Sequence, residues 1–205
     1  MIRESAEVWW NNQYVKDTYI YGEGPNLFLK EHLQELPPGK ILLPAEGEGR
    51  NAVFAAQQGW DVHAVDFSTE GKRKALKLAE LAGVEIDYQV HDLVEFEPPE
   101  ASYDAVAVIY MHLHKANRKV LFPKLLRALK PGGIFLMEVF HQEQLGRDSG
   151  GPPNMEMLYS EFDTELLLQS LEVQAISKEE VTLKEGPRHD GPAVVVRAIA
   201  RKPPQ

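Results

Sequence analysis

The sequence contains no cysteine among its 205 residues. This absence excludes disulfide bonds, thiolate metal sites and a cysteine nucleophile, and it removes redox chemistry as a guide to the compartment. The chain also has no run of eighteen apolar residues, and polar residues follow the first methionine. We therefore expect neither a membrane span nor a signal peptide, and we predict a cytoplasmic protein without a membrane partner.

Positive charge is scarce as well, because 22 Lys and Arg face 31 Asp and Glu for a formal net charge of -9. The mean field of such a chain repels nucleic-acid phosphates, so we expect no nucleic-acid partner. The Lys/Arg-rich stretch at residues 72–77 is predicted to be a solvated helix face. Hydrophobic residues make up 43% of the sequence, which suits one globular domain, monomeric or homodimeric.

What the sequence does contain is a regular alternation of strand and helix patterns. Strands are predicted at residues 40–44, 61–66, 86–90, 104–109, 134–140, 173–183 and 194–200, the sixth in two short runs, 173–177 and 181–183. Helices are predicted at residues 27–36, 52–58, 68–82, 117–129 and 163–170. This alternation predicts an α/β fold with a doubly wound, mostly parallel seven-stranded sheet, helices on both faces and a C-terminal antiparallel hairpin.

The expected single domain divides into four parts. Residues 1–39 form an N-terminal cap rich in aromatic residues, and residues 40–140 form the core that binds a cofactor. A Gly/Pro-rich loop at 141–162 is predicted to cover a substrate, and residues 163–205 complete the sheet.

The segment from 41 to 51 is the centre of the predicted site, because an apolar strand there stops at two glycines and a helix follows. Gly47 and Gly49 have no Cβ, so backbone N–H groups at a helix start are open to a ligand. Asp66 ends the next predicted strand, where a carboxylate is placed to accept hydrogen bonds from ribose hydroxyls.

Six segments in this order resemble those of the class I, seven-stranded Rossmann-like methyltransferases that use S-adenosylmethionine. The resemblance covers most of the chain, and it is strongest to the small-molecule group that includes tellurite-resistance and thiopurine methyltransferases. The segments are Tyr21-Gly22 with Pro25-Asn26, Gly47-Glu48-Gly49-Arg50-Asn51-Ala52, Val65-Asp66-Phe67-Ser68, His91-Asp92-Leu93, Leu129-Lys130-Pro131-Gly132-Gly133 and His189-Asp190-Gly191-Pro192-Ala193.

The resemblance implies S-adenosyl-L-methionine as the cofactor and a small molecule as the methyl acceptor, with a thiol or chalcogen anion as one candidate. The backbone at 45–49 would hold the methionine part, Asp66 the ribose, and Asp92 and Leu93 the adenine. Tyr110 and Met111 would lie near the sulfonium, and Tyr21 and Asn26 would belong to a lid. The full predicted cofactor set is Tyr21, Asn26, Ala45, Glu46, Gly47, Gly49, Asn51, Asp66, Phe67, Asp92, Leu93, Tyr110 and Met111.

The glycine motif departs from the family pattern and leaves two alternatives open. Leu43 stands where the family has an acid and Ala45 where it has a glycine; Glu46 is the candidate replacement for the acid. A non-catalytic protein that binds S-adenosylmethionine is therefore one alternative. The G-x-G-x-x-A spacing also fits an NAD(P)-dependent oxidoreductase, although Glu46 and Glu48 would stand beside its pyrophosphate.

The remaining candidates lie at the predicted carboxyl ends of strands or in nearby loops. An oxygen or nitrogen acceptor needs a general base, whereas a soft anion does not. The candidate catalytic residues are His112, Glu138, His141 and His189, and the candidate substrate-binding residues are Trp10, Arg147 and Arg188. We predict no metal site, because the histidines lack typical ligand spacing.

Overall fold

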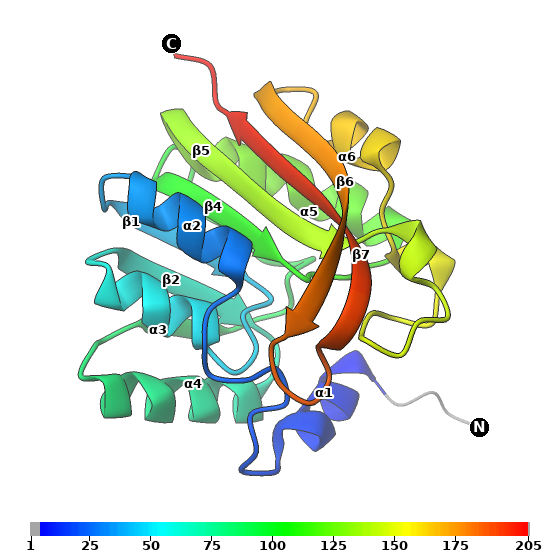
Figure 1. Ribbon diagram of the computed structural model, residues 1–205. Helices are drawn as coiled ribbons and strands as arrows, with labels where there is room; N and C mark the ends of the chain where they lie inside the picture. The colour runs from blue at the N-terminus through cyan, green and yellow to red at the C-terminus, as the bar shows by residue number, and fades with distance from the viewer. Residues whose placement is uncertain (1–4, 205) are drawn as a thin grey trace.

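The computed structural model describes residues 5–204 and contains one seven-stranded sheet, in the order β3-β2-β1-β4-β5-β7-β6 (Figure 1). Its strands are β1 (Lys40–Pro44), β2 (Asp61–Asp66), β3 (Asp87–Val90), β4 (Tyr103–Ile109), β5 (Leu129–Phe140), β6 (Glu172–Lys184) and β7 (Asp190–Arg201). The first five strands pair in parallel, and β7 is antiparallel to both β5 and β6. The predicted fold class is confirmed.

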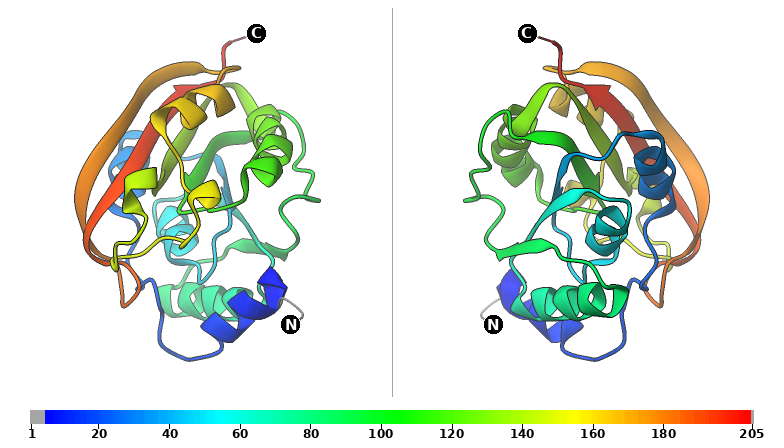
Figure 2. Two further views of the ribbon diagram at one scale, coloured as in Figure 1. Left: turned by 90° about the vertical axis from the view of Figure 1, so that its right-hand side faces the viewer. Right: turned by 90° about the vertical axis from the view of Figure 1, so that its left-hand side faces the viewer.

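Helices cover both faces of the sheet, as the two side views in Figure 2 show. One face carries α2 (Leu27–Glu35) and α3 (Arg50–Gln57), with α4 (Thr69–Ala82) packed against α3, and the other carries α5 (Lys115–Ala128) and α6 (Glu161–Leu167). Two hydrophobic cores result, one on each face. Strands β1 and β4 are buried on both faces, which explains their nearly continuous apolar sequences.

The glycine loop sits where α3 and α4 approach each other most closely. Gly49 precedes α3 with φ of 88°, and a Cβ built on it would lie 2.4 Å from the Cβ of Ala75 in α4. Only glycine fits this position without strain or overlap. Ser68 caps the N-terminus of α4 by accepting a hydrogen bond from the backbone of Gly71, and Gly83 ends the helix in the left-handed conformation.

The structure differs from the sequence expectation in three elements. Residues 6–14 form α1 (Ala6–Tyr14), a helix that was not predicted, and β5 begins at Leu129, the last residue of the predicted helix and five residues before the predicted strand. The two short runs predicted at 173–177 and 181–183 belong to one strand, β6, which pairs with β7 along its length. Polar residues continue through this strand because it lies at the sheet edge, with most of its side chains exposed. Two short 3-10 helices, η1 (Gln142–Gln144) and η2 (Met155–Met157), lie in the predicted cover loop.

Candidate cofactor and acceptor site

The loop after β1 turns Glu46 inward to cap the helix that follows. Its Oε1 accepts hydrogen bonds from the backbone nitrogens of Asn51 (2.9 Å) and Ala52 (2.7 Å), at the start of α3. Burial raises the pKa of Glu46 to about 7, although these hydrogen bonds oppose the shift. Ala45 and Gly47 both have positive φ, of 58° and 60°, so the loop is sharply bent on either side of the acid.

Asp66 and the glycine loop are in direct contact. The Oδ2 atom of Asp66 accepts from the backbone nitrogen of Gly47 (3.1 Å), and Oδ1 accepts from that of Ser68 (2.9 Å). Tyr88 donates to the carbonyl of Gly47 at 2.6 Å and fixes the loop from β3. Burial raises the pKa of Asp66 to about 6. The site therefore holds the buried carboxylate of Asp66 next to Gly47, a buried loop residue that has no Cβ.

The unpredicted helix α1 packs its last residue onto this loop. A Cβ built on Gly47 would lie 2.7 Å from the hydroxyl oxygen of Tyr14, which is the only buried residue of α1. The ring of Trp10 stacks on Tyr14 at a centroid distance of 5.2 Å. Asn11 accepts a hydrogen bond from Ser68 (2.7 Å), so α1 also contacts the start of α4. We call the glycine loop and Asp66 the cofactor half of the site. Trp10, a predicted substrate-binding residue, thus lies near the cofactor half.

Glu48 points away from the cofactor half and binds the segment that follows α1. It forms an ion pair with Lys74 of α4, and both side chains are only 2% exposed. Glu48 also accepts from the backbone nitrogen of Ile20 (2.8 Å), while Lys74 donates to the carbonyls of Lys16 (2.9 Å) and Thr18 (2.6 Å). The prediction that residues 72–77 form a solvated face is wrong for Lys74.

The other predicted cofactor residues lie along the same edge of the sheet. The backbone nitrogen of His91 donates to the carbonyl of Asp66 (2.9 Å), which places Asp92 and Leu93 beside the end of β2. Asp92 is exposed and accepts from the backbone of Val94, while Leu93 is buried. Phe67 is half-buried and Met111 is buried.

A cluster of four rings forms the second half of the site. We call Tyr21, Tyr110, Phe140 and His189 the aromatic cluster. The ring centroid of His189 lies 4.5 Å from those of Tyr21 and Tyr110 and 5.3 Å from that of Phe140. Tyr110 and Phe140 stack on each other at 4.7 Å. Tyr21 belongs to the lid segment, Tyr110 and Phe140 lie at the carboxyl ends of β4 and β5, and His189 lies in the β6–β7 turn. The four rings are far apart in the sequence and come together only in the folded chain.

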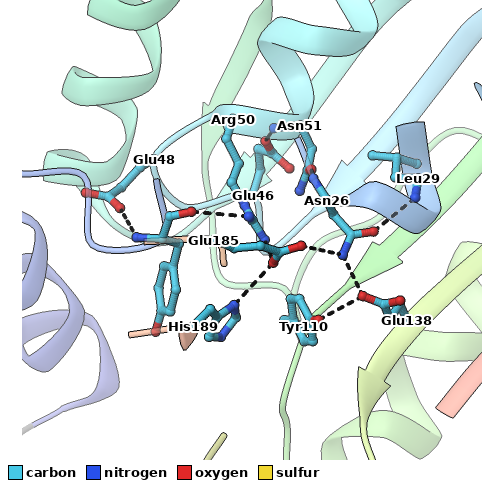
Figure 3. Close-up of polar contacts among 11 residues, drawn as sticks. Asn26, Leu29, Glu46, Glu48, Arg50, Asn51, Tyr110, Glu138, Glu185 and His189 are labelled. Atoms are coloured by element: carbon cyan, nitrogen blue, oxygen red, sulfur yellow. Dashed lines mark hydrogen bonds and ion pairs between the residues drawn. The ribbon is translucent and has the colours of Figure 1, made fainter. Parts of the chain in front are cut away.

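Two carboxylates hold this cluster in place, Glu138, which is buried, and Glu185, which is partly buried (Figure 3). Glu138 accepts from the amide of Asn26 (2.5 Å), from the hydroxyl of Tyr110 (2.8 Å) and from Arg197 (2.6 Å). Glu185 accepts from Arg50 (2.9 Å) and from Asn26 (3.3 Å). Asn26 also caps α2, and its backbone nitrogen donates to the side chain of Asn51 (2.9 Å). The two predicted lid residues, Tyr21 and Asn26, are therefore fixed to the core.

Two of the candidate histidines have both ring nitrogens engaged. In His112, Nδ1 lies 2.9 Å from the carbonyl of Met157, and Nε2 accepts from the backbone nitrogen of Phe140 at 3.4 Å. Burial lowers the pKa of His112 to about 3. In His141, Nδ1 accepts from the backbone nitrogen of Glu143 (3.0 Å) and Nε2 lies 3.2 Å from Glu161.

The two candidate arginines lie in different places. Arg188, in the β6–β7 turn, contacts α1: its guanidinium donates to Gln13 and lies 5.7 Å from the ring centroid of Trp9. Arg147 lies on the outer side of the cover loop, 3.6 Å from Glu180 of β6. Within residues 5–204, no group of three or more His, Asp or Glu side chains is arranged to hold a metal ion.

The sheet order, with β7 inserted antiparallel between β5 and β6, and the glycine loop facing Asp66 give the chain the class I fold of S-adenosylmethionine-dependent methyltransferases. Residues 41–133 match the family model of the methyltransferase domain. The prediction of S-adenosylmethionine as the cofactor agrees with this match.

Two curated relatives match about half of this chain. The 2-methyl-6-phytyl-1,4-hydroquinone methyltransferase of Synechocystis is 28% identical over 112 residues, which are 54% of this chain and 35% of the relative. The ubiquinone biosynthesis O-methyltransferase of Idiomarina loihiensis is 31% identical over 109 residues, 52% of this chain and 44% of the relative. The matches thus span less than half the length of either relative.

Solved structures share the fold over most of the chain. TehB from Haemophilus influenzae gives a TM-score of 0.71 at 15% identity, with 96% of this chain and 66% of TehB covered. A protein studied for the conversion of a disulfide bond into a thioacetal group during echinomycin biosynthesis gives 0.74 at 15%, covering 96% and 90%. The 1,6-didemethyltoxoflavin-N1-methyltransferase of Burkholderia thailandensis, solved with S-adenosylhomocysteine, gives 0.61 at 20%, covering 85% and 75%. The narrower resemblance to tellurite-resistance and thiopurine methyltransferases stays a prediction.

The structure also bears on the expected relation to membranes. Every helix within residues 5–204 is too short or too polar to cross a bilayer.

Proposed function

We propose that the protein is an S-adenosylmethionine-dependent methyltransferase that acts on a small-molecule acceptor. The observation that carries the proposal is the contact between Asp66 and the backbone of Gly47 at the carboxyl edge of the sheet. This contact places the acid expected to bind the ribose beside the glycine loop. When bound, the cofactor supplies a methyl group on a positively charged sulfur. The chain would hold it through the 45–49 backbone and Asp66, and α1 would exclude water from the same site.

The small-molecule acceptor is supported by the aromatic cluster, which lies beyond the ends of β4 and β5 where ligands of parallel sheets bind. Two of the matched relatives are named as a 2-methyl-6-phytyl-1,4-hydroquinone methyltransferase and a ubiquinone biosynthesis O-methyltransferase. Aromatic side chains favour a flat or soft acceptor, so a thiol or chalcogen anion remains our candidate. We propose cytoplasmic action without a nucleic-acid partner, by a monomer or homodimer.

The oxidoreductase alternative is less well supported. Dinucleotide-binding sheets are mostly parallel in the order 3-2-1-4-5-6, whereas here the antiparallel β7 separates β5 from β6. In the sequence, Glu46 and Glu48 argued against a bound pyrophosphate by their negative charge. This argument is weaker in the structure, because Lys74 neutralises Glu48. Formation of a methylated product distinguishes the proposed enzyme from the other alternative, a non-catalytic protein that binds S-adenosylmethionine.

Calorimetric titration with S-adenosylmethionine, S-adenosylhomocysteine and NADH tests the cofactor. We expect binding of the first two only, and Asp66→Ala should weaken it by about 1–3 kcal/mol through lost hydrogen bonds to a charged group. The matched control is Asp61→Ala, at the exposed start of the same strand, where the side chain is 70% exposed. Binding of NADH alone, or equal binding by both variants, would contradict the proposal. Mass spectrometry of acceptor mixtures then distinguishes an enzyme from a binding protein.

A further inference from the structure

The β6–β7 turn places a buried histidine beside a carboxylate that is already paired. Backbone hydrogen bonds close the turn, from Glu185 N to His189 O (2.8 Å) and from His189 N to Gly186 O (3.1 Å). One carboxylate oxygen of Glu185 lies 2.9 Å from Arg50 and 3.5 Å from Nδ1 of His189 (Figure 3). Burial opposes ionisation of Glu185, yet His189 and Arg50 lower its pKa. Glu185 is therefore a carboxylate that faces the imidazole.

This arrangement favours one tautomer of His189. Nδ1 is buried, has no hydrogen-bond partner within residues 5–204 and lies 3.5 Å from a carboxylate oxygen of Glu185, which favours the Nδ1–H tautomer and leaves the lone pair on Nε2. Nε2 makes no hydrogen bond to any residue in the described range 5–204. Burial holds the pKa of His189 below its ordinary value although Glu185 opposes the shift, so the ring is neutral near pH 7.

The ring of His189 lies at the centre of the aromatic cluster. Its exposed fraction is 4%, and the rings of Tyr21, Tyr110 and Phe140 surround it. A Cβ built on Gly150 would lie 2.8 Å from Cδ2 of His189, the carbon bonded to Nε2. The cover loop therefore passes over the ring edge next to the free nitrogen.

The other candidate bases are engaged elsewhere. His112 and His141 use both ring nitrogens, and Glu138 accepts three hydrogen bonds. The charged and titratable groups that face His189 are Glu185 on its own turn, Arg50 of α3, Tyr21, Tyr110 and, beyond Phe140, His112.

We propose that His189 takes the proton of the methyl acceptor, that Glu185 and Arg50 are positioning residues, and that the acceptor is a phenol or an arylalkyl thiol, which arrives protonated. The proposal rests on the proposed methyltransferase function. The acceptor atom forms a bond to the methyl carbon while the carbon–sulfur bond of the cofactor breaks and its electron pair stays on sulfur. The acceptor's proton passes to Nε2 of His189 and then to water.

The first test needs no turnover. 4-Nitrophenol is titrated into the full chain, with and without S-adenosylhomocysteine, and the ionised fraction of the bound probe is read from its absorbance across pH. We expect the wild type to ionise the bound probe at lower pH than His189→Gln does. Glu185→Gln should fall between the two, because it keeps the ring but weakens its orientation. Identical titration curves for the wild type and His189→Gln would overturn the proposal.

The second test compares two acceptors in methyl transfer. Phenylmethanethiol stays protonated at neutral pH, whereas 4-nitrothiophenol is already an anion. His189→Gln should lower kcat about 10²- to 10⁴-fold with the first and less than about tenfold with the second, because general base catalysis is worth that much only when a proton must leave. The exposed His114→Gln is the matched control and should leave both rates unchanged.

The outcomes separate the two proposals. Equal losses on both thiols would give His189 a structural role and overturn the inference, as would turnover of neither thiol by a wild type that binds S-adenosylmethionine. Absence of S-adenosylmethionine binding would instead remove the proposed function, while the absorbance titration would still decide whether His189 accepts a proton from a bound phenol.

Discussion

At the residue scale, the buried acid of the glycine loop makes stability depend on pH. The pKa of Glu46 rises from 4.5 to about 7 on folding, so the native state binds more protons than the unfolded state between these values. The contribution of Glu46 to the free energy of unfolding therefore falls as the pH rises through this window.

Glu46→Gln keeps an oxygen that can accept from Asn51 and Ala52 but removes the charge. We expect its free energy of unfolding to be within about 0.5 kcal/mol of the wild type near pH 5 and about 1–3 kcal/mol higher near pH 8. Urea denaturation at both pH values, without cofactor, measures the difference. Glu70→Gln, on the surface of α4, serves as the control. A constant difference between the two pH values would contradict a shifted pKa for Glu46.

At the element scale, most of the sheet was predictable and α1 was not. Strands β1, β2 and β4 are buried on both faces, so their apolar runs predict them directly. That Asp66 and Gly47 belong to one site was predictable from the order of the strands, because the carboxyl ends of parallel strands meet at one edge. In contrast, α1 has one exposed tryptophan, Trp9, and one buried side chain, Tyr14, so it lacks a helical apolar stripe.

The buried ion pair could not be predicted for a related reason. Lys74 lies in a run of basic residues that looks like a solvated face, and its partner Glu48 is 26 positions away. The contact of Gly49 with α4 and the segment after α1 together bury both. The role of His189 likewise depends on Glu185 and Arg50, which come from different elements and have no common sequence pattern.

This ion pair connects α4 to the segment after α1, so its loss should be costly. Lys74→Met leaves the charge of Glu48 buried without a partner, and we expect a loss of about 3–5 kcal/mol in the free energy of unfolding. Adding Glu48→Gln should restore most of that loss, since no buried charge remains. Lys77→Met, at an exposed position of the same helix, is the control and should stay within about 0.5 kcal/mol. Equal stabilities for the single and double variants would argue against a buried charge at Glu48.

At the scale of the whole molecule, the N-terminal segment and the tip of the β6–β7 hairpin meet beside the site. Figure 1 shows the tip of the β6–β7 hairpin beside α1. Gly186 in this tip packs against the backbone of Gly22, since a Cβ on Gly186 would lie 2.3 Å from the nitrogen of Gly22. The backbone nitrogen of Arg188 donates to the carbonyl of Ile20 at 3.0 Å. The β6–β7 hairpin, which completes the sheet, therefore also holds the N-terminal segment in place at Ile20 and Gly22.

Substitutions of the two candidate arginines test whether the hairpin tip holds the N-terminal segment over the cofactor site. Arg188→Ala removes the side-chain contact with α1, so we expect weaker binding of S-adenosylmethionine, by about two- to tenfold, with faster proteolysis of the N-terminal segment because local opening becomes easier. Arg147→Ala removes only a partly exposed ion pair with Glu180 and should change neither measurement, since such pairs are worth about 0–1 kcal/mol. Calorimetry and limited proteolysis of both variants give the comparison. A stronger effect from Arg147→Ala would mean that the cover loop, and not the hairpin tip, controls access to the cofactor.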